Sequence, residues 1–301
     1  MKLFGPGYYK KFKCIADKCR HSCCIGWEID VDDDALSRFR ELGEGGRAIV
    51  ESIDFSGESP FFGLSDGRCP HLDERGLCKI ITCHGEEYLC DICREHPRFY
   101  NFPSGRCEVG LGAACEEAAR LILSDGGYVE TVEISDDGEE DTDVLPFDAA
   151  RERRELYKLL SIPTASLCDR IGAISERYSI AVDTISDSEW RELLSSLEYL
   201  REESRELFVS SYSSYASPAC EEYAERALAY FVYRHASSAE TEEEFAFSVG
   251  LAIFLERLFA SLTSSLGSDD LDSHVLALRR ISEELEYSED NTEAIRSEFI
   301  K

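Results

Sequence analysis

Apolar residues recur at intervals of three and four through the second half of the chain, from about residue 147 onward. This spacing places them on one face of an α-helix. One predicted helix carries the stripe Leu167, Ile171, Ile174 and Tyr178, and a second carries Trp190, Leu193, Leu194, Leu197 and Leu200. The second opens with a capping box, in which Ser186 stands three residues before Glu189. The pattern predicts amphipathic helices that bury their apolar faces against one another.

More helices are predicted towards the C-terminus, over about residues 218–235, 241–259, 271–287 and 291–299. The helix from residue 241 begins with a second capping box, formed by Thr241 and Glu244. From Phe245 to Phe259 this segment is apolar nearly all round, which is typical of a helix that is covered on every side. We therefore expect it to be central in a helical bundle.

The first 125 residues have a different pattern, because they hold most of the glycines, prolines and cysteines. Short strands are predicted near residues 28–32 and 128–134, and a helix is predicted over 33–42, capped by the Asp32 to Asp34 cluster and ended by the glycines at 43–46. Residues 56–67 are predicted to form a loop. Gly110 and Gly112 precede a helix that includes Cys115; they are either part of a cofactor loop or a plain helix entry.

These patterns predict a mainly α fold with an irregular front part. The expected organisation is a cysteine-rich, metal-binding domain over residues 1–125 with short strands, an acidic linker over 126–146, and an α-helical bundle over 147–301.

Charge and composition limit the partners. The formal net charge of −29 argues against nucleic acid, because phosphate binding needs a basic face. The sequence has no stretch of about 18 consecutive apolar residues, which a membrane span would need, and the N-terminus does not resemble a signal peptide. We therefore expect a cytoplasmic protein with no membrane partner. Five of the eight lysines lie in the first 18 residues, beside the first cysteine motif.

Eleven of the thirteen cysteines lie in the first 115 residues. Four of them, Cys14, Cys19, Cys23 and Cys24, fall within eleven residues, close enough to share one centre. A helical turn between Cys19 and Cys23 would place both sulfurs on one face. Thiols stay reduced in the cytosol, so this cluster is expected to bind metal or to do chemistry rather than to form disulfides.

The thiols suit two kinds of centre. An iron–sulfur cluster takes four thiolates, and a structural zinc ion takes four cysteine or histidine ligands. Only Cys90 and Cys93 form a C-x2-C pair, and the other cysteines are scattered, which favours iron–sulfur over zinc. A histidine could replace one thiolate, and the candidates are His21, His71, His84 and His96. No motif of a serine hydrolase, a zinc protease or a P-loop is present.

The ordered cysteine motifs carry a family resemblance. They read Tyr9-Lys-Lys-Phe-Lys-Cys14, Cys19, Cys23-Cys24-Ile-Gly-Trp27, Cys69-Pro-His-Leu72, Gly76-Leu-Cys78, Cys90-Asp-Ile-Cys93-Arg94, His96-Pro-Arg98 and Cys115-Glu-Glu-Ala-Ala-Arg120. In this order they resemble the flagellin lysine N-methylase family. Weaker similarity continues at Tyr230-Phe-Val-Tyr-Arg234 and over residues 281–291, so the resemblance covers most of the chain.

The resemblance implies an enzyme that uses a Cys-ligated iron–sulfur cluster, of the 4Fe-4S type, and S-adenosylmethionine to methylate lysine side chains of flagellin. It implies as metal ligands the cysteines that match the motifs: Cys14, Cys19, Cys23, Cys24, Cys69, Cys78, Cys90, Cys93 and Cys115. Cys83 and Cys107 do not match. Neither a catalytic residue nor a residue of the methyl-donor site is assigned.

The chemistry expected from this resemblance is a polar methyl transfer. The C-x3-C-x2-C loop of radical enzymes and the glycine fingerprint of ordinary methyltransferases are both missing. Tyr8, Tyr9 and Trp27 could hold a cationic methyl donor or act only in packing. Two alternatives remain: a non-catalytic iron–sulfur or zinc binding protein with a helical interaction scaffold, and a structural zinc protein.

Overall fold

The computed structural model describes residues 2–26, 28–128, 130–136, 145–181, 184–266 and 269–300 of the chain. These residues are mainly helical, which confirms the predicted fold class. They form two compact units. The helical unit contains residues 1–13 and 98–301, and the cysteine unit is Cys14–Pro97. Trp27 and residues 137–144 of the expected acidic linker lie outside the described residues.

The two compact units divide the chain at other places than residue 125, and pairing of distant segments is the reason. The first strand and the segment from Arg98 to Ser124 belong to the helical unit, because they supply strands and a helix to it. Cysteine content is a local property of the chain, whereas a compact unit is defined by contacts between distant segments.

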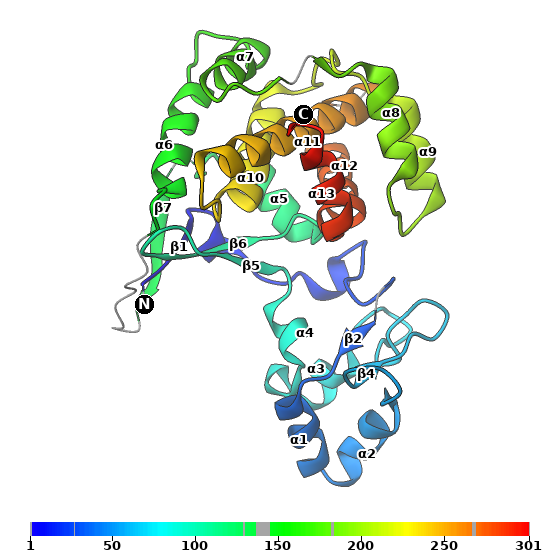
Figure 1. Cartoon of the computed structure of the whole chain (residues 1–301). Coiled ribbons are helices and arrows are strands. Elements are labelled where there is room, and N and C mark those ends of the chain that lie inside the picture. The colour runs from blue at the N-terminus through cyan, green and yellow to red at the C-terminus, as the bar shows by residue number, and fades with distance from the viewer. Residues whose placement is uncertain are drawn as a thin grey trace. The chain divides into compact units, whose positions relative to one another are not determined.

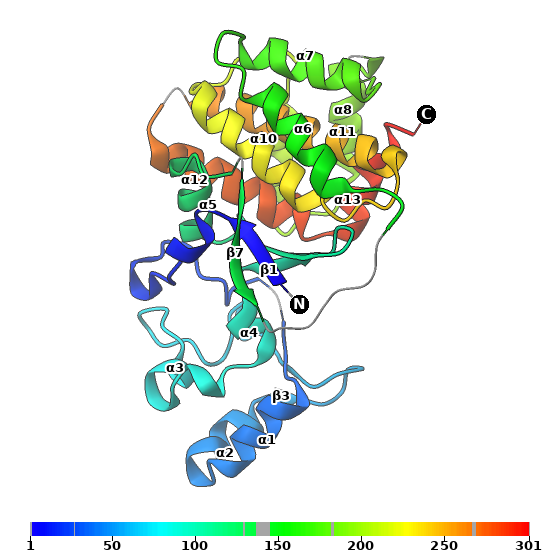
Figure 2. The same ribbon diagram turned by 90° about the vertical axis from the view of Figure 1, so that its left-hand side faces the viewer.

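The helical unit contains a four-stranded sheet in the order β5-β6-β1-β7. β1 is antiparallel to β7, which lies beside it (Figure 2), and parallel to β6, and β5 is antiparallel to β6. The strands are β1 (Lys2–Pro6), β5 (Arg98–Asn101), β6 (Cys107–Leu111) and β7 (Thr131–Asp136). The strand predicted at 128–134 is therefore present, shifted by a few residues. Gly110 lies inside β6, where a Cβ atom would stand 2.2 Å from the ring of Phe99, so this glycine is needed for packing.

Most helices of this unit match the predicted ones, but the stripe that starts at Trp190 is helical only to Ser196, and the helix Glu202–Ser211 was not predicted. The helices are α5 (Glu116–Ser124), α6 (Ala149–Leu160), α7 (Leu167–Arg177), α8 (Asp187–Ser196), α9 (Glu202–Ser211), α10 (Glu221–Ala236), α11 (Glu242–Leu266), α12 (Leu271–Ile281) and α13 (Glu289–Ser297). The capping box at Ser186 and Glu189 is formed as predicted. The helix predicted over 271–287 ends earlier, because one π-helical turn (Ser282–Glu286) follows α12.

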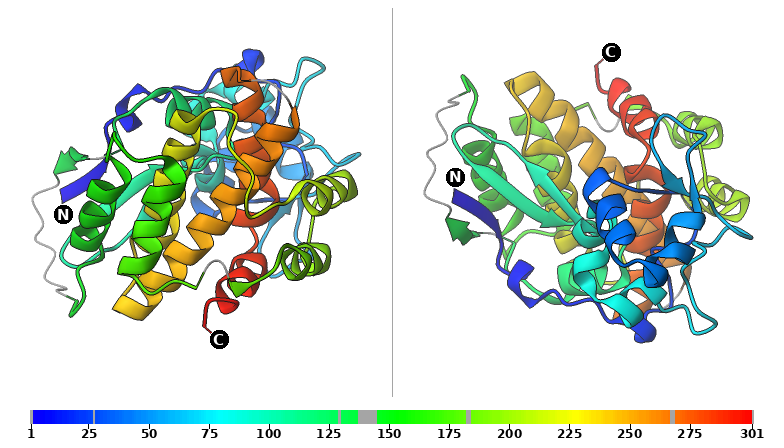
Figure 3. Two further views of the ribbon diagram at one scale, coloured as in Figure 1. Left: turned by 90° about the horizontal axis from the view of Figure 1, so that it is seen from above. Right: turned by 90° about the horizontal axis from the view of Figure 1, so that it is seen from below.

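Helix α11 is the centre of the helical core, as its sequence predicted. Phe245, Val249, Phe254 and Phe259 are all completely buried in it. α10 and α12 both pack along α11 (Figures 1 and 3). α11 is also long and apolar enough to cross a membrane, but 83% of its apolar window is buried inside the protein, as in the core helix of a globular domain.

The cysteine unit contains short elements around a second, smaller core. Its helices are α1 (Asp33–Glu41), α2 (Glu44–Glu51), α3 (Lys79–His84) and α4 (Asp91–Glu95), and its strands are β2 (Ile29–Asp30), β3 (Ile53–Asp54) and β4 (Phe61–Phe62). The strands form an antiparallel sheet in the order β2-β4-β3. β4 lies in the segment that was predicted to be a loop.

Helix α2 was not predicted, because its glycines read as a helix end. Gly43 has a positive φ of 60° and does break the chain after α1, but a new helix starts at the next residue. Gly46 is buried so close to α1 that a Cβ atom would stand 1.8 Å from the carbonyl oxygen of Phe39. Any residue with a side chain at this position would therefore prevent α2 from packing on α1 in this way.

A buried ion pair joins the sheet to the helices in the helical unit. The carboxylate of Glu108 on β6 accepts a hydrogen bond from Nη2 of Arg153 on α6 at 2.9 Å, and its other oxygen lies 2.8 Å from Nη1 of the same guanidinium. Both side chains are almost fully buried, at 0% and 2% exposure. The Arg153 guanidinium also lies 4.6 Å from the ring centroid of Tyr233 on α10. One ion pair thus fixes three elements, and neither charge has solvent to replace its partner.

We predict that Glu108→Ala strongly destabilises the helical unit. Removing one member of a buried ion pair leaves the other charge uncompensated and costs about 3–5 kcal/mol. The measurement is urea unfolding followed by circular dichroism. The control is Glu155→Ala, which breaks an exposed pair with Lys158 on the same helix as Arg153 and should change stability little. Equal losses in the two variants would contradict the role of the Glu108 pair.

Candidate metal centre

Backbone hydrogen bonds bring separate cysteine motifs of the cysteine unit together. The amide of Cys69 donates to the carbonyl of Cys24 at 2.9 Å, and the amide of Gly26 donates to the carbonyl of Gly67 at 2.9 Å. A short antiparallel bridge joins Leu72 to Cys78. The loop at Cys23 and Cys24 is therefore held against the segment that carries Cys69 and Cys78.

Asp32 fixes the C-x2-C motif beside the same core. One carboxylate oxygen accepts from the amide of Ala35 at 2.7 Å and caps α1. The other accepts from the amide of Asp91 at 2.7 Å, at the start of α4. Arg38 on α1 adds a hydrogen bond to the carbonyl of Leu89 at 3.0 Å. Since Cys90 and Cys93 flank and occupy the first turn of α4, these bonds set their position relative to α1.

Six of the described thiols influence one another electrostatically as a result. They are Cys23, Cys24, Cys69, Cys78, Cys90 and Cys93. The sulfurs of Cys23 and Cys24 are 3.9 Å apart. Cys90 and Cys69 are buried, at 1% and 8% exposure, whereas Cys24, Cys78 and Cys93 are half-buried. The six come from three separate stretches of the chain, and all belong to the set implied by the family resemblance.

The pKa values of these thiols reflect their crowding. A hydrogen bond with the Cys24 thiol lowers the pKa of Cys23 to about 7. The same hydrogen bond, burial, and the nearby Cys93 and Cys69 raise the pKa of Cys24. Burial raises the pKa of Cys69 to about 11. Thiolates this close repel each other, and a bound cation would remove the repulsion.

Donor chemistry and donor number suit a soft metal centre. Six neighbouring thiols exceed the four that an iron–sulfur cluster or a structural zinc ion needs. Nevertheless, within the described part of the chain, no three His, Cys, Asp or Glu side chains are arranged around one point as a finished metal site. All thirteen cysteines are described, and none forms a disulfide.

The other three implied ligands are Cys14, Cys19 and Cys115. Cys14 is exposed at the start of the cysteine unit, and the thiol of Cys19 donates to the carbonyl of His21 at 2.8 Å. The prediction of a helical turn from Cys19 to Cys23 is wrong, because a 3-10 turn over Ala16–Lys18 ends at Cys19, whose backbone is extended. Cys115 belongs to the helical unit, where it caps α5 and packs against the helical core. The unmatched Cys107 is buried in β6 of the same unit.

His71 serves the core of the cysteine unit. Its Nε2 atom is 2.9 Å from the hydroxyl of Ser52, and its ring packs edge-on against Phe62 with centroids 4.5 Å apart. Burial lowers the pKa of His71 to about 4, so the ring is neutral near neutral pH. His84 contacts Tyr88 through its ring, with centroids 5.9 Å apart. These contacts give His71 and His84, two of the four candidate histidines, a structural role.

The candidate aromatic residues take different positions. Tyr8 is buried in the helical core, at 2% exposure, and the hydroxyl of Tyr9 accepts a hydrogen bond from Arg98 at 2.9 Å. Both belong to the helical unit rather than to the cysteine unit. Their surroundings favour the packing role over a methyl-donor site.

Comparison with characterised proteins supports the resemblance seen in the motifs. The chain is 25% identical over 128 residues to proteins named Lysine-N-methylase from Salmonella typhimurium and Salmonella choleraesuis. The match covers 40% of this chain and 32% of each relative, so the chain spans about a third of their length. It is also 24% identical over 128 residues to the "Flagellar biosynthetic protein FliU" of Salmonella muenchen, covering 76% of that protein. These matches confirm the predicted resemblance to flagellin lysine methylases.

The other two comparisons found nothing. No family model matches the chain, and no solved structure matches it.

We predict that Asp32→Ala destabilises the cysteine unit in a pH-dependent way. Burial alone would raise the pKa of Asp32, but hydrogen bonds from the amides of Asp91 and Ala35 outweigh it and lower the pKa. A carboxylate with a lowered pKa in the folded state stabilises above its unfolded pKa, and loses this effect as the pH falls through the folded value. Loss of a helix cap costs about 0.5–2 kcal/mol at neutral pH.

Calorimetric unfolding of the metal-free protein checks this prediction. The gap between wild type and Asp32→Ala should be full at about pH 7 and should close below about pH 3, since Asp has an unfolded pKa of about 3.9. Asp34→Ala is the control, because it removes an exposed charge from the same helix and no cap. A pH-independent gap would show that the hydrogen bonds to Asp32 are not responsible.

Proposed function

We propose that this protein is a lysine N-methyltransferase that acts on flagellin. The similarity to proteins named lysine methylase and FliU supports the reaction and the substrate. The convergence of six thiols in the cysteine unit is the structural observation that supports the proposal, because a Cys-ligated cluster needs several thiols near one another. We place the protein in the cytoplasm, where flagellin is made.

Four of the six converging thiols would hold the cluster, which we take to be of the iron–sulfur type. The alternative is zinc, which the same donors could bind. When bound, the cluster would add metal–sulfur bonds between the three segments of the cysteine unit. Metal binding of this kind contributes directly to folding, because the ligands are far apart in the unfolded chain.

Methyl transfer from S-adenosylmethionine is a displacement at carbon. The neutral amine of the substrate lysine forms a bond to the methyl carbon, and the carbon–sulfur bond breaks with its electron pair going to sulfur. The product ammonium then loses a proton to water. The protein contributes alignment of the two reactants, which can supply about 7–11 kcal/mol of the barrier, and exclusion of water.

We predict that protein purified without oxygen is brown and contains iron and acid-labile sulfide. The prediction follows from a donor set made only of thiols, which suits soft metal centres. Metal analysis and visible absorbance measure it. Colourless protein with stoichiometric zinc would show that the site is a structural zinc site and not an iron–sulfur cluster.

We further predict that Cys90→Ser or Cys23→Ser abolishes both metal binding and methyl transfer to flagellin. Serine is a poor ligand at a soft metal centre, so each change removes a donor. Cys168→Ser is the control, since Cys168 is exposed on α7 in the helical unit and should tolerate the change. Mass spectrometry of flagellin lysines, with the purified protein and from a deletion strain, reads the transfer.

Two outcomes would redirect the function. Unchanged flagellin methylation in the deletion strain would leave a non-catalytic metal-binding protein with a helical interaction scaffold. Full transfer by the Cys90→Ser protein after loss of its metal would separate the reaction from the cluster.

A further inference from the structure

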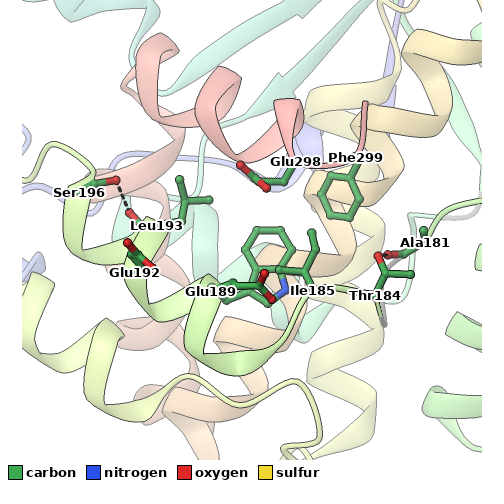
Figure 4. A pocket seen from close by; sticks show the side chains of 10 residues that line it. Ala181, Thr184, Ile185, Glu189, Glu192, Leu193, Ser196, Glu298 and Phe299 are labelled. Carbon is green, nitrogen blue, oxygen red and sulfur yellow. Dashed lines mark hydrogen bonds between the residues drawn. The ribbon is translucent and has the colours of Figure 1, made fainter. Parts of the chain in front are cut away.

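A cavity in the helical unit has no role in the function proposed above. It lies between α8 and the segment that follows α13, and it has a volume of about 570 Å³. Figure 4 shows side chains of α8 on one side and Glu298 and Phe299 on the other. The volume is within the range of about 300–1,000 Å³ that is common for ligand sites.

The charge of this cavity selects a cation. Glu189, Glu192 and Glu298 line it, and no Lys or Arg is among its described lining residues. A second cavity of about 400 Å³ shares Phe299 with the first and adds Glu242 and Glu243, again with no basic lining residue. Glutamates from three separate elements therefore line two neighbouring cavities. The net charge of the whole chain is −29, which further favours a cation over an anion there.

Aromatic side chains give the cavity an apolar wall. Trp190 is 1% exposed, and its ring centroid is 4.5 Å from that of Phe254 and 5.7 Å from that of Phe299. Phe299 packs on α11 at Gly250, where a Cβ atom would be 2.7 Å from the ring. Such a wall suits the methylene stem of a lysine or arginine, while the charged group stays among carboxylates.

Trp190 also offers a hydrogen bond that the protein does not use. Its indole Nε1 is buried and has no acceptor among the described residues, although the side chain lines the cavity. Buried donors of this kind normally have a partner. The indole N–H is a donor only, so it requires an acceptor such as a peptide carbonyl oxygen.

We infer that this cavity docks a basic, lysine-bearing peptide segment of the protein substrate, with the ammonium among Glu189, Glu192 and Glu298 and a backbone carbonyl at Trp190. This inference rests on the proposed function for the identity of the substrate. It makes the cavity a docking site that holds the segment while another lysine is methylated.

Two chemical arguments exclude other occupants. S-adenosylmethionine carries a carboxylate, and the lining residues that the structure describes include no cationic side chain to bind it. The acceptor lysine must be neutral to attack the methyl group, whereas surrounding carboxylates stabilise the protonated amine. A lysine that stays protonated throughout is the better match.

The test is binding of a short fluorescent peptide with two lysines among alanines and glycines, acetylated and amidated, to the full chain without methyl donor. A peptide with glutamines in place of the lysines is the comparison. Fluorescence anisotropy at low salt should show the lysine peptide binding about tenfold more tightly, and the difference should shrink at high salt.

Variants locate the site. Glu192→Gln with Glu298→Gln should weaken binding of the lysine peptide about tenfold, as about threefold for each carboxylate. Trp190→Phe keeps an aromatic ring, loses the N–H, and should weaken it about threefold. The matched control is Glu203→Gln with Glu206→Gln on α9, which removes the same charge from exposed positions outside both cavities and should change binding less than about twofold.

Equal binding of the two peptides, equal effects of the two double variants, or no binding of the lysine peptide at about 1 mM would each overturn the inference. Because the assay contains no methyl donor, its result is independent of catalysis. Methyl transfer without peptide binding would remove the docking site alone, and peptide binding without methyl transfer would remove the proposed enzyme and leave a basic-peptide binding site.

Discussion

A helix without a polar face has to be covered on every side, and α11 imposes this condition on the helical unit. Its side chains from Phe245 to Phe259 are mostly buried, so neighbouring helices must supply apolar faces around it. α10 and α12 do so along its length. Phe299 reaches α11 from beyond α13 and packs at Gly250. Covering α11 thus also builds the wall of the cavity at α8, so one packing requirement contributes to both the stability and the surface chemistry of this unit.

The cysteine unit is organised by a different constraint, since its core is small. Ile29, Phe39, Ile53 and Phe62 are among the few large side chains that it buries. Small cores are commonly supplemented by metal sites or disulfides. Here polar bonds contribute, above all the two that Asp32 makes to the starts of α1 and α4. The partly buried Cys78 and Cys93 pack at the edge of this core, so the same contacts that complete the core gather the thiols.

Charged side chains lie in two settings, the buried core and the surface. Two buried carboxylates of the helical unit are paired with arginines, Glu108 with Arg153 at 2.8 Å and Glu286 with Arg234 at 3.4 Å. The excess acidic side chains lie at the surface, where they do not disturb the fold and attract basic partners. The glutamates around Phe299 are one place where that surplus borders a hollow. A lysine-rich segment is the kind of partner that such a surface attracts.

Local patterns in the sequence were enough for most helices of the helical unit. The stripe from Trp190 to Leu197 and the capping box at Ser186 depend on residues three or four apart, and such neighbours interact whatever the rest of the chain does. Helix α2 escaped prediction because its glycines are unfavourable locally, and only the contact of Gly46 with α1 explains them.

Tertiary structure decided which thiols meet. Cys24 and Cys69 are joined through backbone hydrogen bonds between loops, and Asp32 reaches an amide 59 residues further along the chain. The same is true of the compact units, in which β1 pairs with strands more than a hundred residues away. Spacing along the chain carries no information about such contacts, since they depend on how separately folded segments pack together.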